Sequence, residues 1–240
     1  MKKFFFLIFF SSLLFSLDKI QINVIKEVYN TCKKYKAKDG FSFENTCAAI
    51  ALKESSAGKH LIGDQGKYPE ILVNSSLGVM QIRVKTVLHV LKKFPKLRQQ
   101  YKGFWHEDIN AIDKYLPLLA SMNYFKYKWK QAIKFRDKKK IKKYKKLYLK
   151  YKYKFSKYKK AYYKDLRIAE TLLSDIRFSA KIAAHYLILN YEIAKQRHYW
   201  NPWWKAVSRY NGGWNNRKYV SGVIRKMRIV RSLKRKGVLK

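Results

Sequence analysis

Hydrophobic residues recur at helical spacing along most of the chain. Between residues 20 and 36 they fall at Ile22, Ile25, Val28 and Tyr29, which places them on one face of a helix. The same kind of pattern predicts further helices at about residues 43–54, 82–94, 176–194 and 219–229. The chain is therefore predicted to be all-α.

The predicted helix at residues 43–54 is apolar on most of its sides. The run from Ala48 to Leu52 is entirely hydrophobic, which is typical of a buried helix. The helix ends in an acidic residue, Glu54, just before a break at Ala57 and Gly58. This order predicts a carboxyl group held at the end of a buried helix and followed by a long loop.

Residues 95–170 have a different composition, and their second half is almost entirely Lys, Tyr, Phe and Leu. Large hydrophobic residues step through it by three and four positions, which predicts a helix with one such face and lysines on the others. Phe125, Trp129 and Ile133 on the preceding stretch are expected to pair with this face in an antiparallel helical hairpin. The face consists of Ile141, Tyr144, Tyr148, Tyr151, Phe155, Tyr158 and Tyr162.

Three interpretations of this Lys/Tyr-rich helix are open. Its aromatic face packs internally while the lysines are solvated, or the helix lies on an anionic wall or membrane surface. Interleaved aromatic and basic residues also bind single-stranded nucleic acid. The N-terminal segment described next makes nucleic acid the least expected of the three partners.

The first sixteen residues have the pattern of a secretory signal peptide. Lys2 and Lys3 precede an apolar run over residues 4–15, and Ser16 marks a plausible cleavage point. The apolar run is shorter than the roughly 20 residues needed to span a bilayer. We expect residues 17–240 to form the mature protein, periplasmic or secreted, with an uncleaved membrane anchor as the alternative.

Net charge is extreme, at +40 with a pI of about 10.2. A hydrophobic content of 48% still provides enough apolar residues for a core. Such a charge attracts polyanions in general, including nucleic acid, anionic lipid and acidic wall polymers. Charge alone therefore does not identify the partner.

The only two cysteines, Cys32 and Cys47, form an even pair. In an oxidising compartment such a pair suggests a disulfide, although two buried free thiols are the alternative. The five histidines are scattered, and no CxxC or HExxH pattern occurs. We expect no metal site and no cofactor.

Three short segments carry candidate chemistry. They are Ala51–Ser56, which contains Glu54, Gly78–Ile82 with the sequence GVMQI, and Ser208–Gly213 with the sequence SRYNGG. An acidic residue that closes an apolar run, a Gly-x-Met-Gln turn and a Tyr-Asn-Gly-Gly turn occur here in one order behind a leader peptide. Together they resemble the soluble lytic transglycosylases, which share a lysozyme-like domain with goose-type lysozyme and cleave the glycan strands of peptidoglycan.

Cleavage of a glycosidic bond needs a proton donor for the leaving oxygen and stabilisation of an oxocarbenium-like centre. A buried position at the end of an apolar helix favours the neutral form of a carboxyl group, so Glu54 is the candidate general acid. Most glycosidases use a second carboxylate, and Asp64 and Glu70 are the candidates for one. The resemblance implies instead that one glutamate acts as acid and then as base, closing a 1,6-anhydro ring on the muramoyl residue.

The resemblance also implies which residues contact substrate around Glu54. By matching motif positions, Ser55 lies near the acid, Gly78, Met80 and Gln81 line the sugar groove, and the hydroxyl of Tyr210 orients the carboxyl group. Core packing is the alternative for Met80 and Tyr210, and a surface or capping glutamate is the alternative for Glu54. The full set of implied substrate-binding residues is Ser55, Gly78, Met80, Gln81, Tyr210, Asn211 and Tyr219.

The chain departs from the family pattern at several positions. Val79 replaces a leucine, Gly213 stands where Ala-Gly is usual, and residues 95–170 have no counterpart in the minimal domain. We therefore expect an all-α, lysozyme-like domain at residues 17–240, interrupted by a long basic helical insertion. The alternatives are a hydrolytic muramidase on the same fold and a non-catalytic, cationic protein that binds the cell wall.

Overall fold

The computed structural model describes residues 17–65, 67–68 and 70–240, so the predicted signal peptide at residues 1–16 lies outside the described residues. Over this part of the chain the regular elements are helices, and β-type pairing is confined to three isolated bridges, which confirms the all-α prediction. None of these helices is long and apolar enough to cross a membrane.

The chain divides into two compact units, which are described separately. The described residues of the first unit are 17–63, 77–82 and 171–240, and those of the second are 64–65, 67–68, 70–76 and 83–170. The first unit contains α2 (Lys19–Lys33), α3 (Glu44–Glu54), α9 (Ile176–Gln196), α10 (Pro202–Tyr210) and α11 (Arg217–Arg235). The second contains η1 (Leu72–Asn74), α4 (Val84–Lys93), α5 (Pro95–Gln100), α6 (Ala111–Lys134), α7 (Lys138–Ser156) and most of α8 (Lys159–Ser174).

Helix α2 begins at a capping box. The side chain of Asp18 accepts from the Gln21 amide at 2.7 Å, and the Gln21 side chain accepts from the Asp18 amide at 3.0 Å. The predicted apolar face is buried, with Ile25 and Val28 fully removed from solvent. The helix ends at Lys33, three residues before the predicted end.

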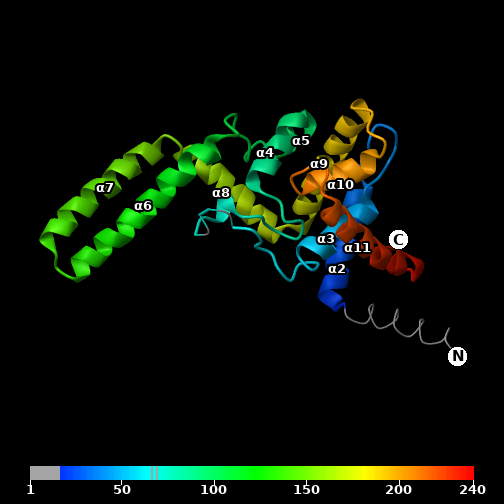
Figure 1. Ribbon diagram of the computed structural model, residues 1–240, viewed down its shortest axis with the longest axis horizontal. Helices are drawn as coiled ribbons and strands as arrows, with labels where there is room; N and C mark the ends of the chain where they lie inside the picture. Colours follow the sequence, from blue (N-terminus) through cyan, green and yellow to red (C-terminus); the bar gives the residue numbers. More distant parts are fainter. Residues whose placement is uncertain (1–16, 66, 69) are drawn as a thin grey trace. The chain divides into compact units, whose positions relative to one another are not determined.

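Helix α3 is the central element of the first unit. Every residue from Thr46 to Leu52 is buried, as the apolar run predicted, because α2, α9 and α11 all pack against this helix (Figure 1). A disulfide joins Cys32 on α2 to Cys47 on α3, with the two Cα atoms 6.6 Å apart. Closing a loop of this length restricts the unfolded chain by about 3 kcal/mol in the chain-entropy model. The disulfide thereby ties the beginning of α3 to the last turn of α2.

In the second unit, α6 and α7 form the antiparallel hairpin that the heptad-like stripe predicted (Figure 1). Phe125 stacks against Tyr151 with ring centroids 5.5 Å apart, and Trp129 stacks against Tyr148 at 5.7 Å. The aromatic stripe is therefore used largely for packing, and the lysines of α7 face solvent.

The stripe does not run along one continuous helix, however. Helix α7 ends at Ser156, whose hydroxyl bonds back to the Tyr153 carbonyl at 2.6 Å, and α8 begins at Lys159. Tyr162 therefore belongs to α8, and its ring packs against Phe155 at 5.4 Å. The pattern of aromatic positions identified the packing face correctly but did not reveal the break between the two helices.

A buried carboxylate ties α6 and α8 together. Asp165 is completely buried, where it accepts a hydrogen bond of 2.7 Å from the Tyr115 hydroxyl and lies 2.7 Å from Nε2 of His106. Burial raises the pKa of the Tyr115 hydroxyl, and the Asp165 charge adds to the effect. The tyrosine therefore stays protonated and remains a donor to the carboxylate.

Candidate functional site

The three motif segments lie in the first unit, and Ser55 links the first of them to the second. Its side chain is fully buried, and its hydroxyl contacts the Val79 carbonyl at 2.8 Å and the Ala51 carbonyl at 3.1 Å. The same oxygen accepts from the Gly58 amide at 2.9 Å. Ser55 therefore fixes the turn after α3 against the GVMQI turn, and its hydroxyl is occupied by backbone partners.

Gly78 permits a close approach of two backbone segments. Its φ is +72°, and a Cβ atom there would lie 2.0 Å from the Leu172 carbonyl oxygen and 2.8 Å from Oγ of Ser179. Only glycine fits both the conformation and the space. In this structure the glycine makes room for the protein's own backbone.

Met80 and Gln81 complete this turn. Met80 is fully buried, which matches the core-packing alternative, and Gln81 adopts a φ of +49°. Nε2 of Gln81 donates to the His60 and Gly78 carbonyls, both at 3.0 Å. These bonds hold the turn in a single shape beneath the end of α3.

Tyr210, at the end of α10, closes the link from the third motif to the second. Its hydroxyl donates to the Met80 carbonyl at 2.9 Å, and its ring lies 5.8 Å from the ring of Tyr186. Burial raises the pKa of this hydroxyl well above its usual range, and the carboxylate of Glu54 raises it further. Tyr210 is therefore near Glu54, but its proton is directed at a backbone carbonyl.

The loop that follows Tyr210 is held by polar side chains. Oδ1 of Asn211 accepts a hydrogen bond of 3.0 Å from Nδ2 of Asn216. The backbone N–H of Asn216 donates to the Ser208 hydroxyl at 2.6 Å. Asn216 also caps α11 by accepting from the Tyr219 amide at 3.0 Å. Asn211 thus stabilises the loop that delivers Tyr219.

Tyr219 is the tyrosine whose hydroxyl interacts with the candidate acid. Burial is the main cause that raises the pKa of the Tyr219 hydroxyl. The charge of Glu54 and the neighbouring Tyr210 raise this pKa further, and hydrogen bonding to Glu54 contributes least. The tyrosine hydroxyl and Oε1 of Glu54 are both buried, and neither has a partner within full hydrogen-bond geometry. The Tyr219 hydroxyl is therefore near Glu54, whereas the Tyr210 hydroxyl, which the resemblance implied would orient the carboxyl group, bonds to the Met80 carbonyl.

Glu54 differs from the other acidic residues of the first unit. Its side chain is 17% exposed, and it is the acidic residue there that has a buried oxygen without a hydrogen bond. Each of the other acidic residues of this unit accepts at least one hydrogen bond from another residue of the protein. They are Asp18, Glu27, Asp39, Glu44, Asp175 and Glu192.

Two further residues shape the surroundings of Glu54. The ammonium of Lys53 lies 3.8 Å from Oε1 of Glu54 and 4.4 Å from the centre of the Tyr219 ring. Its aliphatic chain passes over Gly222, where a Cβ atom would lie 2.8 Å from Cε of the lysine. The sequence did not point to Lys53, because adjacent positions on a helix rarely face a common partner.

An aromatic cluster adjoins the loop after Tyr210. The ring centroids of Tyr199 and Trp214 lie 5.8 Å apart, and Nζ of Lys205 lies 4.6 Å from the centroid of the Tyr199 ring. Trp200 is 94% exposed, which is unusual for so large a side chain. The motifs gave no indication of this cluster, because its members come from residues outside them.

The two candidates for a second carboxylate, Asp64 and Glu70, belong to the second unit. Asp64 forms an ion pair with Arg83 in that unit. Across the described residues, no three His, Cys, Asp or Glu side chains lie close enough together to hold a metal ion.

No protein-family model, curated protein or solved structure matches this chain. The chemistry that the site supports is proton transfer by a single carboxyl group. One of its oxygens is buried between a protonated tyrosine and a lysine ammonium, and the remainder of the side chain is partly accessible.

Proposed function

We propose that the protein is a peptidoglycan lytic transglycosylase with a lysozyme-like fold, in which Glu54 acts first as general acid and then as base. The observation that carries this proposal is the convergence of the three motif segments on the end of α3. Ser55 bonds to Val79, Tyr210 bonds to Met80, and Tyr219 lies beside Glu54. Each of these links joins segments that are remote in the sequence.

The proposed reaction cleaves the β-1,4 bond between N-acetylmuramic acid and N-acetylglucosamine. Glu54 donates its proton to the glycosidic oxygen as the bond to C1 of the muramoyl residue breaks, and the substrate's own acetamido group stabilises the positive centre. The C6 hydroxyl of the same residue then attacks C1 and returns its proton to Glu54. The products are a free N-acetylglucosamine end and a 1,6-anhydromuramoyl end.

The neighbours of Glu54 suit its change of role. Because the pKa of Tyr219 is raised, its hydroxyl stays protonated and can donate to the carboxylate that forms when Glu54 loses its proton. The Lys53 ammonium lies 3.8 Å from Oε1 of the same carboxyl group. Both groups can therefore contact the carboxylate that acts as base in the second step.

The test is mass spectrometry of purified peptidoglycan digested by the protein and by Glu54→Gln. We expect anhydromuropeptides from the natural sequence and none from the variant, because an amide cannot supply the proton. Reducing-end products that also disappear in the variant would identify the hydrolytic muramidase. If glycan turnover is the same with both proteins, or absent with both, Glu54 is not a catalytic acid.

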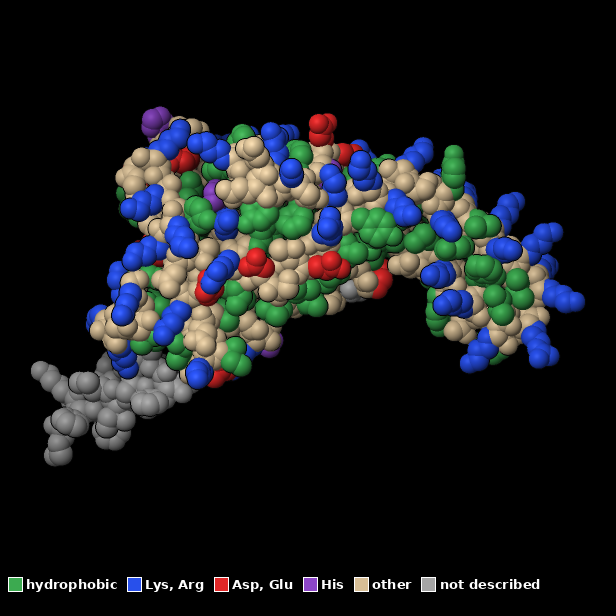
Figure 2. Space-filling model, turned by 180° about the vertical axis from the view of Figure 1, so that it is seen from behind, with side chains coloured by type: hydrophobic (Ala, Val, Ile, Leu, Met, Phe, Trp, Pro, Cys, Tyr) green, Lys and Arg blue, Asp and Glu red, His purple; other side chains and the backbone are tan. Residues whose placement is uncertain are grey.

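The hairpin is proposed to hold the protein on an anionic wall or membrane surface. Although its aromatic stripe is packed, Phe135 at the turn between α6 and α7 is 73% exposed among basic neighbours. Figure 2 shows Lys and Arg side chains over much of the visible face, with few acidic ones between them. Exposed aromatic residues within a basic surface favour an anionic interface.

This attachment is tested by the variant Lys142→Gln, Lys146→Gln, Lys150→Gln, which removes three exposed charges from α7. We expect weaker cosedimentation with wall fragments or with anionic vesicles. Unchanged binding to both would contradict the role of the hairpin. Periplasmic or secreted localisation, also proposed, is checked by cell fractionation and by sequencing the N-terminus of the mature protein.

A further inference from the structure

The C-terminal half of α11 borders a basic hollow at the opposite end of the α3–α11 pair from Glu54. The hollow has a volume of about 780 Å³ and is lined by residues of α3 and α11. These residues are Asn45, Arg228, Arg231, Ser232, Lys234 and Arg235. Asn45 belongs to the first turn of α3, whereas Glu54 ends that helix, and their separation of nine positions corresponds to about 14 Å along the helix.

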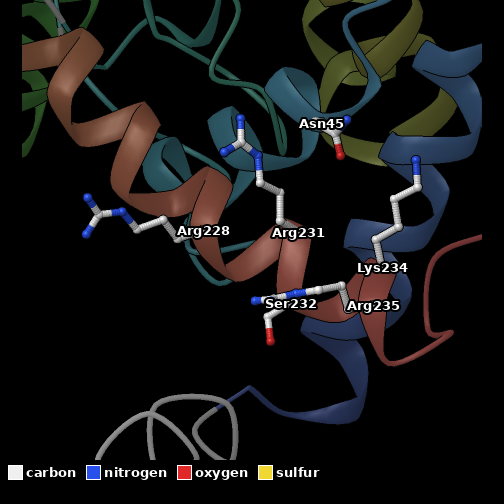
Figure 3. Close-up of a pocket in the computed structure, with 6 residues that line it drawn as sticks. All are labelled: Asn45, Arg228, Arg231, Ser232, Lys234 and Arg235. Carbon is white, nitrogen blue, oxygen red and sulfur yellow. The ribbon is translucent and has the colours of Figure 1, made fainter. Parts of the chain in front are cut away.

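Figure 3 shows how the lining residues lie. Arg231 and Lys234 extend from α11 on the side of Asn45, while Arg228 and Arg235 leave the same helix in other directions around the hollow. Oδ1 of Asn45 is buried without a hydrogen-bond partner. The hollow therefore combines cationic donors with one amide oxygen, which is an acceptor and takes no part in binding an anion.

No carboxylate within the described residues forms an ion pair with these four basic side chains. Arg228, Arg231 and Arg235 follow each other at helical spacings of three and four residues, where like charges destabilise a helix. The helix dipole favours basic residues only in the last turn, so it accounts for Lys234 and Arg235 but not for Arg228. A bound anion would offset this repulsion.

The predominance of arginine in this part of α11 indicates which class of anion fits the hollow. The basic residues of α7 are all lysine, whereas this part of α11 has arginine at most of its basic positions. A guanidinium presents a planar fork of donors that matches phosphate or carboxylate oxygens, which a lysine ammonium does not. Because four positive charges surround the hollow without a compensating acid, a multiply charged phosphate fits it better than a single carboxylate.

We propose that this hollow is a binding site for a phosphate group, with Arg228, Arg231 and Arg235 as its principal donors. Lys234 supplies further charge, and the Ser232 hydroxyl provides a neutral donor. The site does not depend on the glycan chemistry at Glu54, because it occupies the other end of the helix pair. It would tether the protein to a phosphate-bearing polymer or lipid while Glu54 remains available.

The test is isothermal titration of the full chain with inorganic pyrophosphate at about 0.15 M salt, where distant charges are screened. The first variant is Arg228→Gln, Arg231→Gln, Arg235→Gln. The matched control is Lys92→Gln, Lys93→Gln, Lys96→Gln, which removes the same charge from exposed positions on α4 and α5. We expect the first variant to bind at least about tenfold more weakly and the control to bind as the natural sequence does.

A second variant, Arg228→Lys, Arg231→Lys, Arg235→Lys, keeps the charge and removes the forked donors. A several-fold loss of affinity is expected from it, and an undiminished affinity would overturn the assignment to arginine. The proposal also fails if the natural sequence does not bind pyrophosphate, if acetate binds equally well, or if the control on α4 and α5 loses as much affinity. Circular dichroism of each variant checks that the helices are retained.

The source of the phosphate is distinguished by competition. Vesicles of phosphatidylglycerol, compared with phosphatidylcholine, test a lipid headgroup, and poly(glycerol phosphate) tests a polymer. Displacement of pyrophosphate by either one supports the site and identifies its source, whereas displacement by neither overturns it. Glu54→Gln should bind pyrophosphate normally, so failure of the proposed glycan chemistry and failure of this site give separate results.

Discussion

At the scale of single residues, the site separates positioning groups from groups that face the acid. Ser55, Gly78 and Asn211 use their polar atoms or their lack of a side chain to hold backbone segments together. Tyr219 and Lys53 instead direct polar groups at Glu54. Motif residues are therefore not equivalent, and their replacement should affect different properties.

The two tyrosines provide a direct comparison. Tyr219→Phe removes a hydroxyl that has no full hydrogen bond, so the melting temperature should change little while activity on glycan falls about tenfold or more. Tyr210→Phe removes the bond to the Met80 carbonyl and should lower stability by about 1 kcal/mol. The melting temperature and the rate at which glycan products are formed are measured for both variants. Equal activity losses accompanied by equal destabilisation would contradict the division of roles.

Gly78→Ala tests the close approach at the second motif. The new Cβ atom would overlap the Leu172 carbonyl in a backbone conformation that alanine rarely adopts, so we expect a loss of about 2 kcal/mol or more. Gly40→Ala is the matched control, because Gly40 also has a positive φ of +82° but nothing within 4 Å of a Cβ atom. Urea denaturation should show a clearly larger effect at Gly78, and similar effects would mean that only the backbone conformation matters.

At the scale of helices and turns, short-range sequence patterns predicted which helices exist better than they predicted where each helix begins and ends. The apolar run of α3 is buried and the aromatic stripe of α7 packs against α6, as expected, since each pattern reports which face meets other helices. The break between α7 and α8 escaped prediction because the pattern of lysines and aromatic residues runs through Ser156 and Lys157 without a glycine or proline. The loop before α3 is also held by tertiary contacts, through Asp39.

Asp39 links this loop to α9 and contributes to acid sensitivity. The ammonium of Lys195, followed by the Phe41 amide, holds the pKa of the Asp39 carboxyl at about 2. A lowered folded-state pKa stabilises the protein above the ordinary aspartate range near 4, and this contribution is lost as pH falls toward 2. Because the pair is partly exposed, it amounts to no more than about 1 kcal/mol.

Asp39→Asn should therefore be less stable than the natural sequence at neutral pH and equally stable near pH 2. Acid titration of the unfolding free energy by circular dichroism measures the difference directly. A difference that persists unchanged down to pH 2 would mean that the aspartate acts through packing or backbone bonds alone.

At the scale of the whole molecule, charge is the dominant property. The chain carries 55 basic and 15 acidic residues, so attraction to anionic polymers acts over the full surface as well as at particular sites. This general attraction must be separated from binding at the hollow on α11 and at the hairpin. Salt provides the means, because it screens distant charges more than direct contacts.

We expect binding to purified wall fragments to weaken steeply between 0.05 and 0.5 M salt, concentrations that span Debye lengths of roughly 14 to 4 Å. Cosedimentation at several salt concentrations measures this dependence. Pyrophosphate binding at the hollow should fall less steeply over the same range, since it involves direct contacts. Binding to wall fragments that does not respond to salt would show that charge is not what attracts the protein to them.

The sequence by itself determined the helical class, the buried character of α3 and the aromatic packing face of the hairpin, and it singled out Glu54 as a candidate acid. These features depend on periodicity and on residue type, which a linear pattern contains. Only the tertiary structure decided that Ser55 and Met80 are buried, that the Tyr210 hydroxyl serves a backbone carbonyl, and that Tyr219 approaches the acid. It also brought Asn45 and the arginines of α11 around one hollow. These contacts depend on how α3, α10 and α11 pack against one another. Helix packing brings together residues that are far apart in the sequence, and no local sequence pattern shows that they touch.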